Sequence, residues 1–418
     1  MNSLFTYLLN LLALCGLIFL LYRKYKDVIS PILFFGSLAI KIVAGMMMGI
    51  VFSAYYESGD TWFYYNKAKE LTELPFNSFW NNLITPTVSS EQVRAIYFTR
   101  ISSILLYFTK ANYWLASVYF SVFSFYACFY FLSALNNWNR SFLLPSMLSL
   151  LFFPTAFFWS AGILKESLAF GSVLFILGFY LKGKAQPNRV PMDYFLVVLA
   201  IFLLAILKYY VLAVLIPILI YLVLLEKLTK NRWLRFSPWV NNALLFGIML
   251  FPTWAFLNLL HPNLAMNQFL DVIQNTHDHI LSDSKIENRL TSVDWLGEPF
   301  DFILNVIYFL FSGLFRPLPL DNISGLAILS SIENLLVVVI IIWKIGSGRF
   351  SFRIYSPQVG GLILYIVVLA VFLSYSIPNL GALARFKVYY FPFVLMLVLI
   401  DHPLLDKISK WKIIRGLW

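Results

Sequence analysis

The chain has 418 residues, of which 60% are apolar and only 12% are charged, and its mean hydropathy is +0.78. A soluble domain of this composition would expose large apolar patches to water, so the solvent around most of the chain must be lipid. The formal charge of +11 could indicate nucleic-acid binding. The cations, however, lie in short loops beside apolar runs, which membrane topology explains better. We therefore expect membrane lipids, and no nucleic acid, as partners.

About eleven apolar runs are long enough, or nearly so, to cross about 30 Å of hydrocarbon as helices. They show no strict alternation of apolar and polar residues, and a backbone in lipid must satisfy its own hydrogen bonds, which favours helices over a barrel. We predict an all-α polytopic membrane protein with one integral membrane domain over residues 1–418. The predicted spans are residues 3–22, 31–54, 112–134, 142–158, 167–181, 194–208, 210–225, 239–260, 325–343, 359–377 and 388–401.

The lysines and arginines of alternate loops give the chain a direction through the positive-inside rule. The first loop carries Arg23, Lys24 and Lys26, so we predict the N-terminus outside and the C-terminus in the cytoplasm. This count requires the short apolar stretch 302–315 to be re-entrant or interfacial; if it spans, the last loops invert. The loops predicted to be cytoplasmic are 23–26, 136–141, 182–189, 226–235, 344–353 and the C-terminal tail.

Two long stretches without a predicted span, residues 55–111 and 261–324, both fall on the predicted outer face. Loops of this length are usually functional or disordered. The run Ser89–Glu91 has the pattern of a helix cap before apolar and aromatic residues that continue to Tyr107, so we expect interfacial helices here. Most of the polar residues that are costly beside lipid collect on this face, which favours a function there.

The first candidate site follows the second predicted helix, in the segment Glu57–Lys67. If Asp60 opens a helix, its carboxylate is favoured at the helix N-terminus, and Tyr64 lies one turn further along the same face. Helix capping alone would explain Asp60. The alternative is a carboxylate among aromatic rings that serves as the general base for a sugar hydroxyl.

The second candidate site combines Trp159, Lys165 and Glu166, inside an otherwise apolar stretch. Two adjacent ionisable residues are costly there unless they face a wet cavity or a partner. Lys165 would bind phosphate and Glu166 would hold it in place; the alternative is a lysine that extends to the interface. Lys208 lies beside Tyr209 at a tight outer turn, where it needs an anion from a protein carboxylate or a lipid phosphate. The alternative is again a lysine that extends to the interface.

The third candidate group lies near the C-terminal end of the chain. Arg316 precedes a run of alternating proline and leucine, and Arg385 and Lys387 precede the last predicted helix. The planar fork of arginine suits bidentate binding of phosphate. The alternative for Arg385 is a structural ion pair with Glu333, which lies inside a predicted span, or with Asp321.

Other common site chemistries have little support in the sequence. His277 and His279 lie near two aspartates, but their spacing is not typical of a zinc site. The sequence has neither a GxxxxGK[ST] phosphate loop nor a GxSxG elbow, which argues against ATP-driven transport and serine hydrolysis. Cys15 and Cys128 both lie in apolar runs, so they predict neither a disulfide framework nor a thiolate metal site.

Several of these features together resemble the GT-C superfamily of membrane glycosyltransferases. They are an acidic residue in the first large outer loop, Asp60, expected interfacial helices after it, many spans, and cations at the outer boundary. The segments Phe153–Glu166, Arg316–Leu320 and Gly381–Lys387 are similar to stretches of bacterial membrane proteins grouped with polysaccharide-assembly enzymes. In GT-C enzymes the acidic loop usually follows the first helix, so here either an extra N-terminal helix is present or Asp60 is not the base.

The resemblance implies an enzyme of the bacterial inner membrane that moves a sugar from a polyprenyl-phosphate-linked donor to a glycan or lipid acceptor at the outer face. Such a donor brings its own leaving group and anchor, so no nucleotide cofactor is expected, while help from a divalent metal stays open. An O-antigen or exopolysaccharide polymerase or ligase is the nearest alternative; a transporter or flippase of lipid-linked saccharides, without bond chemistry, is the alternative from another class. The implied roles are catalytic base for Asp60, phosphate binding for Lys165, Lys208, Arg316, Arg385 and Lys387, contact with sugar and isoprenoid for Tyr64, Trp159 and Tyr209, and support for Glu166 and Glu333.

Overall fold

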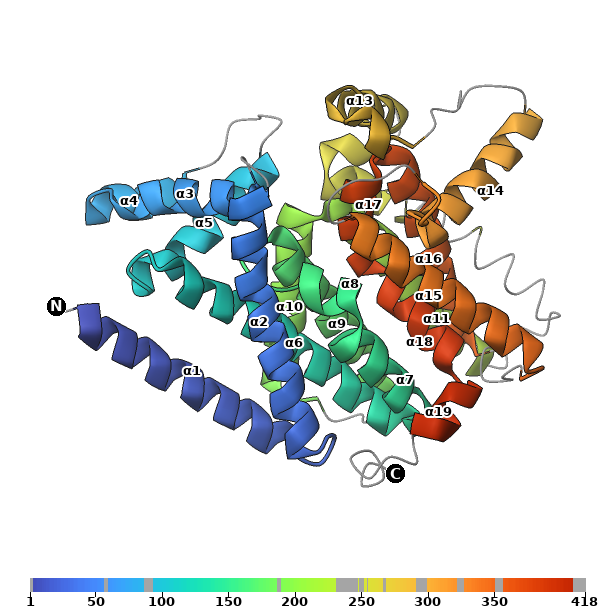
Figure 1. Ribbon diagram of the computed structural model, residues 1–418, viewed down its shortest axis with the longest axis horizontal. Coiled ribbons are helices and arrows are strands. Elements are labelled where there is room, and N and C mark those ends of the chain that lie inside the picture. Colours follow the sequence, from blue (N-terminus) through green and yellow to red (C-terminus); the bar gives the residue numbers. More distant parts are fainter. Residues whose placement is uncertain are drawn as a thin grey trace. The chain divides into compact units, whose positions relative to one another are not determined.

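The structure is a computed structural model in which helices make up the described part of the chain (Figure 1). Within that part there is no strand, and extended backbone pairs at one isolated bridge, between Arg289 and Asn379. The all-α prediction is therefore confirmed for these residues. The residues described are 3–55, 59–85, 93–185, 189–230, 247, 252–253, 255–265, 268–290, 299–321, 327–349 and 356–408.

Seven helices among the described residues are long and apolar enough to cross a membrane, or eight if the bent pair Leu380–Tyr389 and Phe391–Leu399 is one span. These helices fit an integral membrane protein, but the predicted number of about eleven spans is not confirmed. Three further apolar helices are shorter: Arg140–Phe152, Pro191–Leu207 and Leu304–Phe315. Five segments with sequence predictions lie wholly or mostly outside the described residues: 89–91, 231–235, 239–260, 350–353 and 409–418.

The chain divides into two compact units, Met1–Lys208 with Leu404–Trp418, and Tyr209–Pro403. The single membrane domain expected from the sequence stays a prediction. The helices of the first unit are α1 (Ser3–Tyr25), α2 (Pro31–Tyr55), α3 (Asp60–Thr72), α4 (Phe76–Ile84), α5 (Val93–Phe108), α6 (Tyr113–Trp138), η1 (Arg140–Phe142), α7 (Leu143–Met147), η2 (Leu148–Phe152), α8 (Pro154–Trp159), α9 (Lys165–Ala185), α10 (Pro191–Leu207) and, from its second residue on, α19 (Pro403–Ile408).

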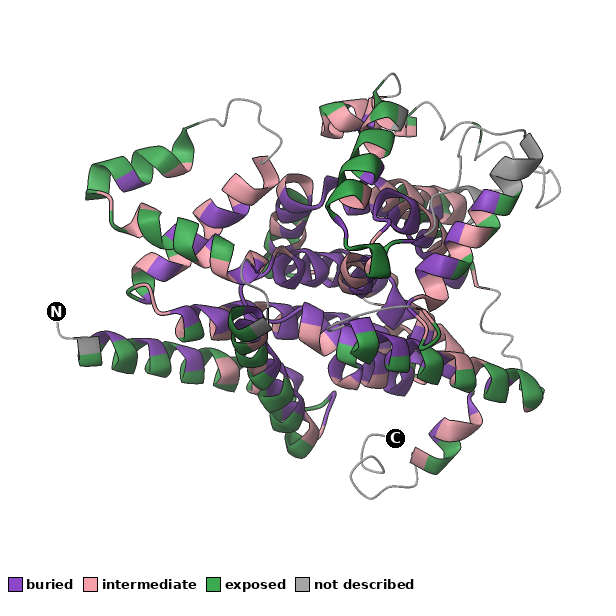
Figure 2. Cartoon of the chain, turned by 45° about the horizontal axis from the view of Figure 1, so that its top comes forward, coloured by how far each residue is buried: buried purple, intermediate pink, exposed green. Residues whose placement is uncertain are grey.

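The core of the first unit is built on α6 and α9, which pack against each other, with α10 on α9 and α2 on α6. The apolar window of α6 is 72% buried, whereas that of α1 is only 22% buried. Figure 2 shows exposed residues along the whole of α1, the helix that begins at the N mark. Large apolar side chains on such a surface are stable in lipid and costly in water, so α1 is suited to face the hydrocarbon.

The helices predicted for the first long outer stretch are present as α3, α4 and α5. Figure 1 shows α3 and α4 running across the end of α2 instead of along it. This arrangement agrees with interfacial helices, although their position on a membrane stays a prediction. The expected cap at Ser89–Glu91 lies outside the described residues.

Two aromatic side chains fix the start of α3 against the core. The indole nitrogen of Trp62 donates to the Gly49 carbonyl of α2 at 2.9 Å, and its ring stacks on Tyr113 of α6 with centroids 4.3 Å apart. The hydroxyls of Thr61 and Tyr113 lie 2.8 Å apart in a buried hydrogen bond. Buried polar groups that are fully hydrogen-bonded favour a single arrangement, so these contacts fix the first turn of α3 against α2 and α6.

The predicted span 142–158 is interrupted. A π-helix, η2, ends at Phe152, and α8 begins at Pro154, which has no N–H to continue the preceding hydrogen bonds. After α8 the chain leaves helical geometry over residues 160–164, all buried, before α9 begins. Non-helical backbone at membrane depth requires partners inside the protein. Ser124 donates to the Ser160 carbonyl at 2.6 Å, and the Gly162 N–H donates to Ser121 at 3.1 Å.

We expect Gly162→Ala to lower the free energy of unfolding by about 1–2 kcal/mol. Gly162 has φ +70°, and an added Cβ would lie 3.2 Å from the Gly45 carbonyl oxygen. Thermal unfolding of the purified protein in detergent measures the change. Gly36→Ala in α2 is the control, because a Cβ there meets nothing within 4 Å. Equal melting of the two variants would show that the 160–164 segment tolerates a side chain at Gly162.

The second unit contains α11 (Tyr209–Lys230), η3 (Pro262–Leu264), α13 (Phe269–Asp283), η4 (Ile286–Asn288), α14 (Pro299–Phe315), α15 (Ala327–Gly346), α16 (Pro357–Ser376), α17 (Leu380–Phe386), η6 (Lys387–Tyr389) and α18 (Phe391–Leu399). α16 packs against both α11 and α14. The backbones of α14 and α16 approach closely at Gly313, where a Cβ would lie 2.3 Å from the Ala370 carbonyl. The stretch predicted to be re-entrant or interfacial, 302–315, lies in α14, whose membrane position stays a prediction.

Candidate functional site

The first unit brings together two segments that are far apart in the sequence. Lys165, the first residue of α9, is half-buried, and its Nζ lies 4.8 Å from the ring centroid of Tyr64 on α3. Tyr64 is 5% exposed and meets Phe98 of α5 edge to face, with centroids 4.9 Å apart. A cation over an aromatic face in a partly dry site is held by about 0.5–2 kcal/mol. The contact therefore fixes the Lys165 ammonium beside α3.

Asp60 is the first residue of α3, one turn before Tyr64. The extended residue before the helix is Gly59, whose carbonyl accepts the first backbone hydrogen bonds, so Gly59 and not Asp60 occupies the N-cap position. The Asp60 carboxylate is half-buried in the first turn, where the positive end of the helix dipole stabilises an anion. A carboxylate in this position is a candidate general base.

Lys208 is paired inside the protein. Its Nζ lies 3.0 Å from Oε1 of Glu166, and the two side chains are 4% and 1% exposed. The anion that Lys208 needs is therefore supplied by a protein carboxylate, and Glu166 holds Lys208. Lys165 is half-buried and so more accessible than Lys208, which makes it the better candidate of the two for the predicted phosphate ligand. Trp159 ends α8 and is 7% exposed, which leaves little of its ring for a sugar.

A buried lysine supports the interrupted segment that precedes Lys165. Lys41, in the middle of α2, is 3% exposed and donates to the hydroxyl of Ser160 and to the Ala156 carbonyl. The positive charge lies at the carbonyl end of α8, where the helix dipole favours it. The sequence shows that Lys41 lies inside an apolar run and therefore needs a partner. It does not show which residues are the partners, because their positions depend on the non-helical turn after α8.

In the second unit, Arg316 closes a local turn. Its guanidinium lies 3.3 Å from Asp321, and a second nitrogen donates to the Tyr308 hydroxyl at 3.1 Å. Asp321 also accepts from the Leu318 N–H at 2.7 Å. The Arg316 and Asp321 side chains are 27% and 14% exposed, so part of the guanidinium stays accessible.

An asparagine connects this turn to Lys387. Asn334 of α15 donates to the Pro317 carbonyl at 2.8 Å and accepts from Lys387 at 3.3 Å. Lys387 is 1% exposed, also donates to the Leu314 carbonyl at 3.1 Å, and lies in the field of Glu333. The structure thus brings the predicted residues Arg316, Glu333 and Lys387 into one network. The sequence interpretation missed Asn334, although a polar residue beside Glu333 in an apolar run is a usable signal.

The remaining two predicted residues of this unit lie against aromatic rings. Arg385 is half-buried near the end of α17, with its guanidinium 5.1 Å from the ring centroid of Phe386. Tyr209 begins α11, and its ring stacks on His261 with centroids 3.9 Å apart, while its hydroxyl accepts from Asn263 at 3.3 Å. One face of the Tyr209 ring is therefore already covered by protein.

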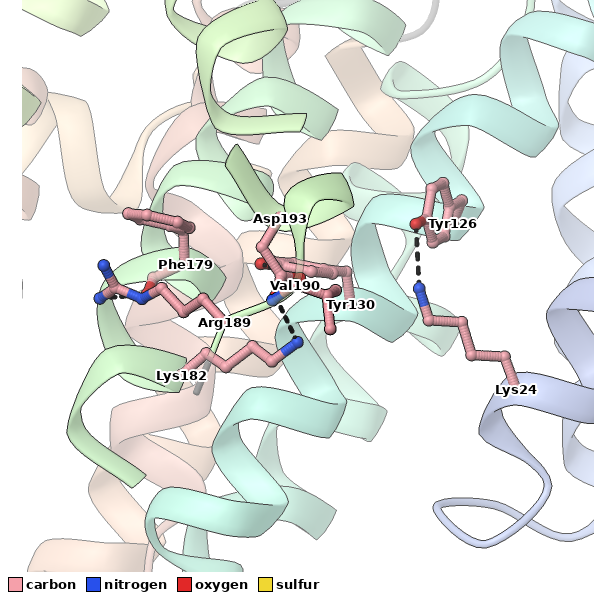
Figure 3. Close-up of polar contacts among 8 residues, drawn as sticks. All are labelled: Lys24, Tyr126, Tyr130, Phe179, Lys182, Arg189, Val190 and Asp193. Atoms are coloured by element: carbon pink, nitrogen blue, oxygen red, sulfur yellow. Dashed lines mark hydrogen bonds and ion pairs between the residues drawn. The ribbon is translucent and has the colours of Figure 1, made fainter. Parts of the chain in front are cut away.

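A polar cluster around Asp193, which the sequence interpretation missed, lies between α6, α9 and α10 (Figure 3). Asp193 of α10 is 2% exposed and accepts from Lys182 at 2.7 Å, from the Tyr130 hydroxyl at 3.1 Å and from the Val190 N–H at 2.9 Å. These contacts join α6, α9 and α10. The cluster is fully hydrogen-bonded, which is typical of a structural tie.

Among the described residues, no group of three or more His, Cys, Asp or Glu side chains is placed to hold a metal ion. His277 is buried against the Tyr375 carbonyl at 2.7 Å, and the exposed His279 lies 3.2 Å from Asp283. No family model, curated protein or solved structure matches the chain.

Proposed function

We propose that the protein is a membrane glycosyltransferase that moves a sugar from a polyprenyl-phosphate-linked donor to a glycan or lipid acceptor. We place the reaction at the outer face of the bacterial inner membrane, with the N-terminus outside and the C-terminus in the cytoplasm. The observation that carries this proposal is the contact of Lys165 with Tyr64, 4.8 Å from its ring centroid, one helical turn from Asp60. A carboxylate and a cation on adjacent elements are the two groups that this reaction needs from the protein.

The proposed chemistry is a single displacement. The acceptor hydroxyl oxygen attacks the anomeric carbon of the sugar while its proton passes to the Asp60 carboxylate. The bond from that carbon to the phosphate oxygen breaks, and both electrons leave with the polyprenyl phosphate. Lys165 stabilises the negative charge that develops on the phosphate, because a fixed cation in a partly dry site needs no reorganisation during the reaction.

The phosphate role of Lys165 predicts a specific kinetic change. Lys165→Gln removes the charge and is expected to raise the KM for the donor about 10- to 100-fold, the loss of one charge-assisted hydrogen bond. Initial rates over a range of donor concentrations, with the protein in detergent, give this value. Lys165→Arg should retain most of the affinity, and Lys67→Gln is the matched control, because Lys67 is exposed and paired with Glu70 on α3. A donor KM unaffected by Lys165→Gln would remove Lys165 from the phosphate site.

Transport of a lipid-linked saccharide is a second candidate function, favoured by the interrupted helices. The first unit has the break between α8 and α9, and the second unit has a 62° bend between Leu380–Tyr389 and Phe391–Leu399. Discontinuous helices are typical of transporters, in which unwound segments and helix ends bind the substrate. Bond cleavage distinguishes the two functions, since a transporter returns its donor chemically unchanged. Donor size distinguishes a transferase of single sugars from a polymerase or ligase.

A further inference from the structure

A polar pocket lies at the opposite end of α2 from Asp60. Its volume is about 360 Å³, and its polar lining includes Lys26, Asp27 and Ser30 from the α1 to α2 turn, Asn136 from the last turn of α6 and Arg140 from the start of η1. The 25 residues of α2 separate it from the start of α3 by about 37 Å along the helix. The pocket is therefore distinct from the proposed transfer site.

The ends of the surrounding helices place this pocket at a membrane surface. α1 and α2 are both candidate spans, and the pocket is formed by the short turn between them. A turn that joins two spans lies in the headgroup layer, where phosphate groups are concentrated. The basic residues of this turn predict that the layer is the cytoplasmic one, whose surface is rich in anionic lipid.

The lining has the chemistry of a site for one negative charge. Lys26 and Arg140 carry two positive charges and Asp27 one negative charge, which leaves a formal charge of +1. Ser30 precedes the first residue of α2, and its hydroxyl oxygen is buried and, among the described residues, has no hydrogen-bond partner. The N-terminus of α2 adds the positive end of a helix dipole, and Asn136 adds an amide donor.

We propose that this pocket binds the phosphate group of an anionic phospholipid in the adjacent leaflet. The net charge of the lining matches the single charge of a phosphodiester, and the hydroxyl of Ser30 and the amide of Asn136 donate to its oxygens. Soluble phosphate shares this chemistry. The position of the pocket between two lipid-facing helices favours the phospholipid, whose tails lie along the apolar surface of α1.

The test compares lipid binding by the purified full-length protein in detergent, with phosphatidylglycerol added and bound lipid counted by native mass spectrometry. Lys26→Ala combined with Arg140→Ala is expected to weaken binding about 10- to 30-fold. The control is Arg23→Ala combined with Lys184→Ala, which removes two cations from the same predicted side but outside the pocket. A third variant, Asn136→Asp, keeps the size of the side chain, adds a negative charge and should also weaken binding.

The proposal is supported if phosphatidylglycerol binding falls in the two pocket variants and not in the control variant. The wild type should also bind phosphatidylcholine more weakly than phosphatidylglycerol. Equal binding by the pocket and control variants would overturn it. Inorganic phosphate separates the two sources: displacement of the lipid by a few millimolar phosphate would assign the pocket to a soluble anion instead of a lipid. Sugar transfer does not enter this measurement, so its outcome is independent of the proposed enzyme activity.

Discussion

Glu166→Ala is expected to lower the free energy of unfolding by about 3–5 kcal/mol, among the largest effects of any single substitution in the first unit. The Glu166 carboxylate lies 3.0 Å from the Lys208 ammonium, and both side chains are almost fully buried. Removal of the carboxylate leaves a buried positive charge without this partner, and an uncompensated charge costs far more than the pair itself contributes. Thermal unfolding of the purified protein in detergent gives the change.

The control for Glu166→Ala is an exposed pair. Lys67 and Glu70 lie 2.9 Å apart with side chains 53% and 61% exposed, so Glu70→Ala should change stability by less than about 1 kcal/mol. Joint replacement by Glu166→Gln and Lys208→Met should recover much of the lost stability, because neither charge of the pair is then left buried. If Glu166→Ala lowered the free energy of unfolding no more than Glu70→Ala does, the buried ion pair would not stabilise the first unit.

Asp60→Asn is expected to reduce the maximal rate of sugar transfer about 10²- to 10⁴-fold, the usual contribution of a general base. Asparagine retains the size of the side chain and its place in the first turn of α3, but it does not accept the acceptor proton as a carboxylate does. Initial rates at saturating donor isolate the effect on kcat.

Glu70→Gln is the matched control for Asp60→Asn, because it removes one carboxylate from the exposed end of the same helix. It should leave the rate within about twofold of the wild type. Unfolding curves for both variants must overlay that of the wild type, so that a loss of rate reports on chemistry. A full rate in Asp60→Asn would rule out this residue as the base.

Hydropathy predicted the long helices well, because a lipid solvent makes long apolar helices the favoured solution for most of the chain. The expected runs at 3–22, 31–54 and 167–181 correspond to α1, α2 and α9 within a few residues. The run 142–158 was different. Its interruption depends in part on Pro154, which is visible in the sequence. It also depends on two hydrogen bonds between α6 and the non-helical turn, one donated by Ser124 and one accepted by Ser121, and these follow only from the packing.

The candidate site could be predicted in its residue types but only partly in its contacts. The cost of a buried charge predicted that Lys208 would pair with either a protein carboxylate or a lipid phosphate. In the structure its partner is the carboxylate of Glu166. The contact of Lys165 with Tyr64 had no sequence signal, because it depends on where the packing of α3 on α5 and α2 places Tyr64. Asp321 pairs with Arg316 in a local turn, where its carboxylate also accepts from the Leu318 N–H. The sequence interpretation had named Asp321 only as a possible partner of Arg385.

The proposed transfer activity is tested most directly by the fate of a labelled sugar. The purified protein is reconstituted in vesicles with a polyprenyl-phosphate donor labelled in its sugar and with envelope glycans and lipids as acceptors. We predict that the label leaves the polyprenyl lipid and becomes covalently attached to an acceptor, and that Asp60→Asn slows this transfer without change in folding. Label that stays on intact donor while the donor crosses the bilayer, equally in wild type and Asp60→Asn, would contradict a transferase and indicate a transporter.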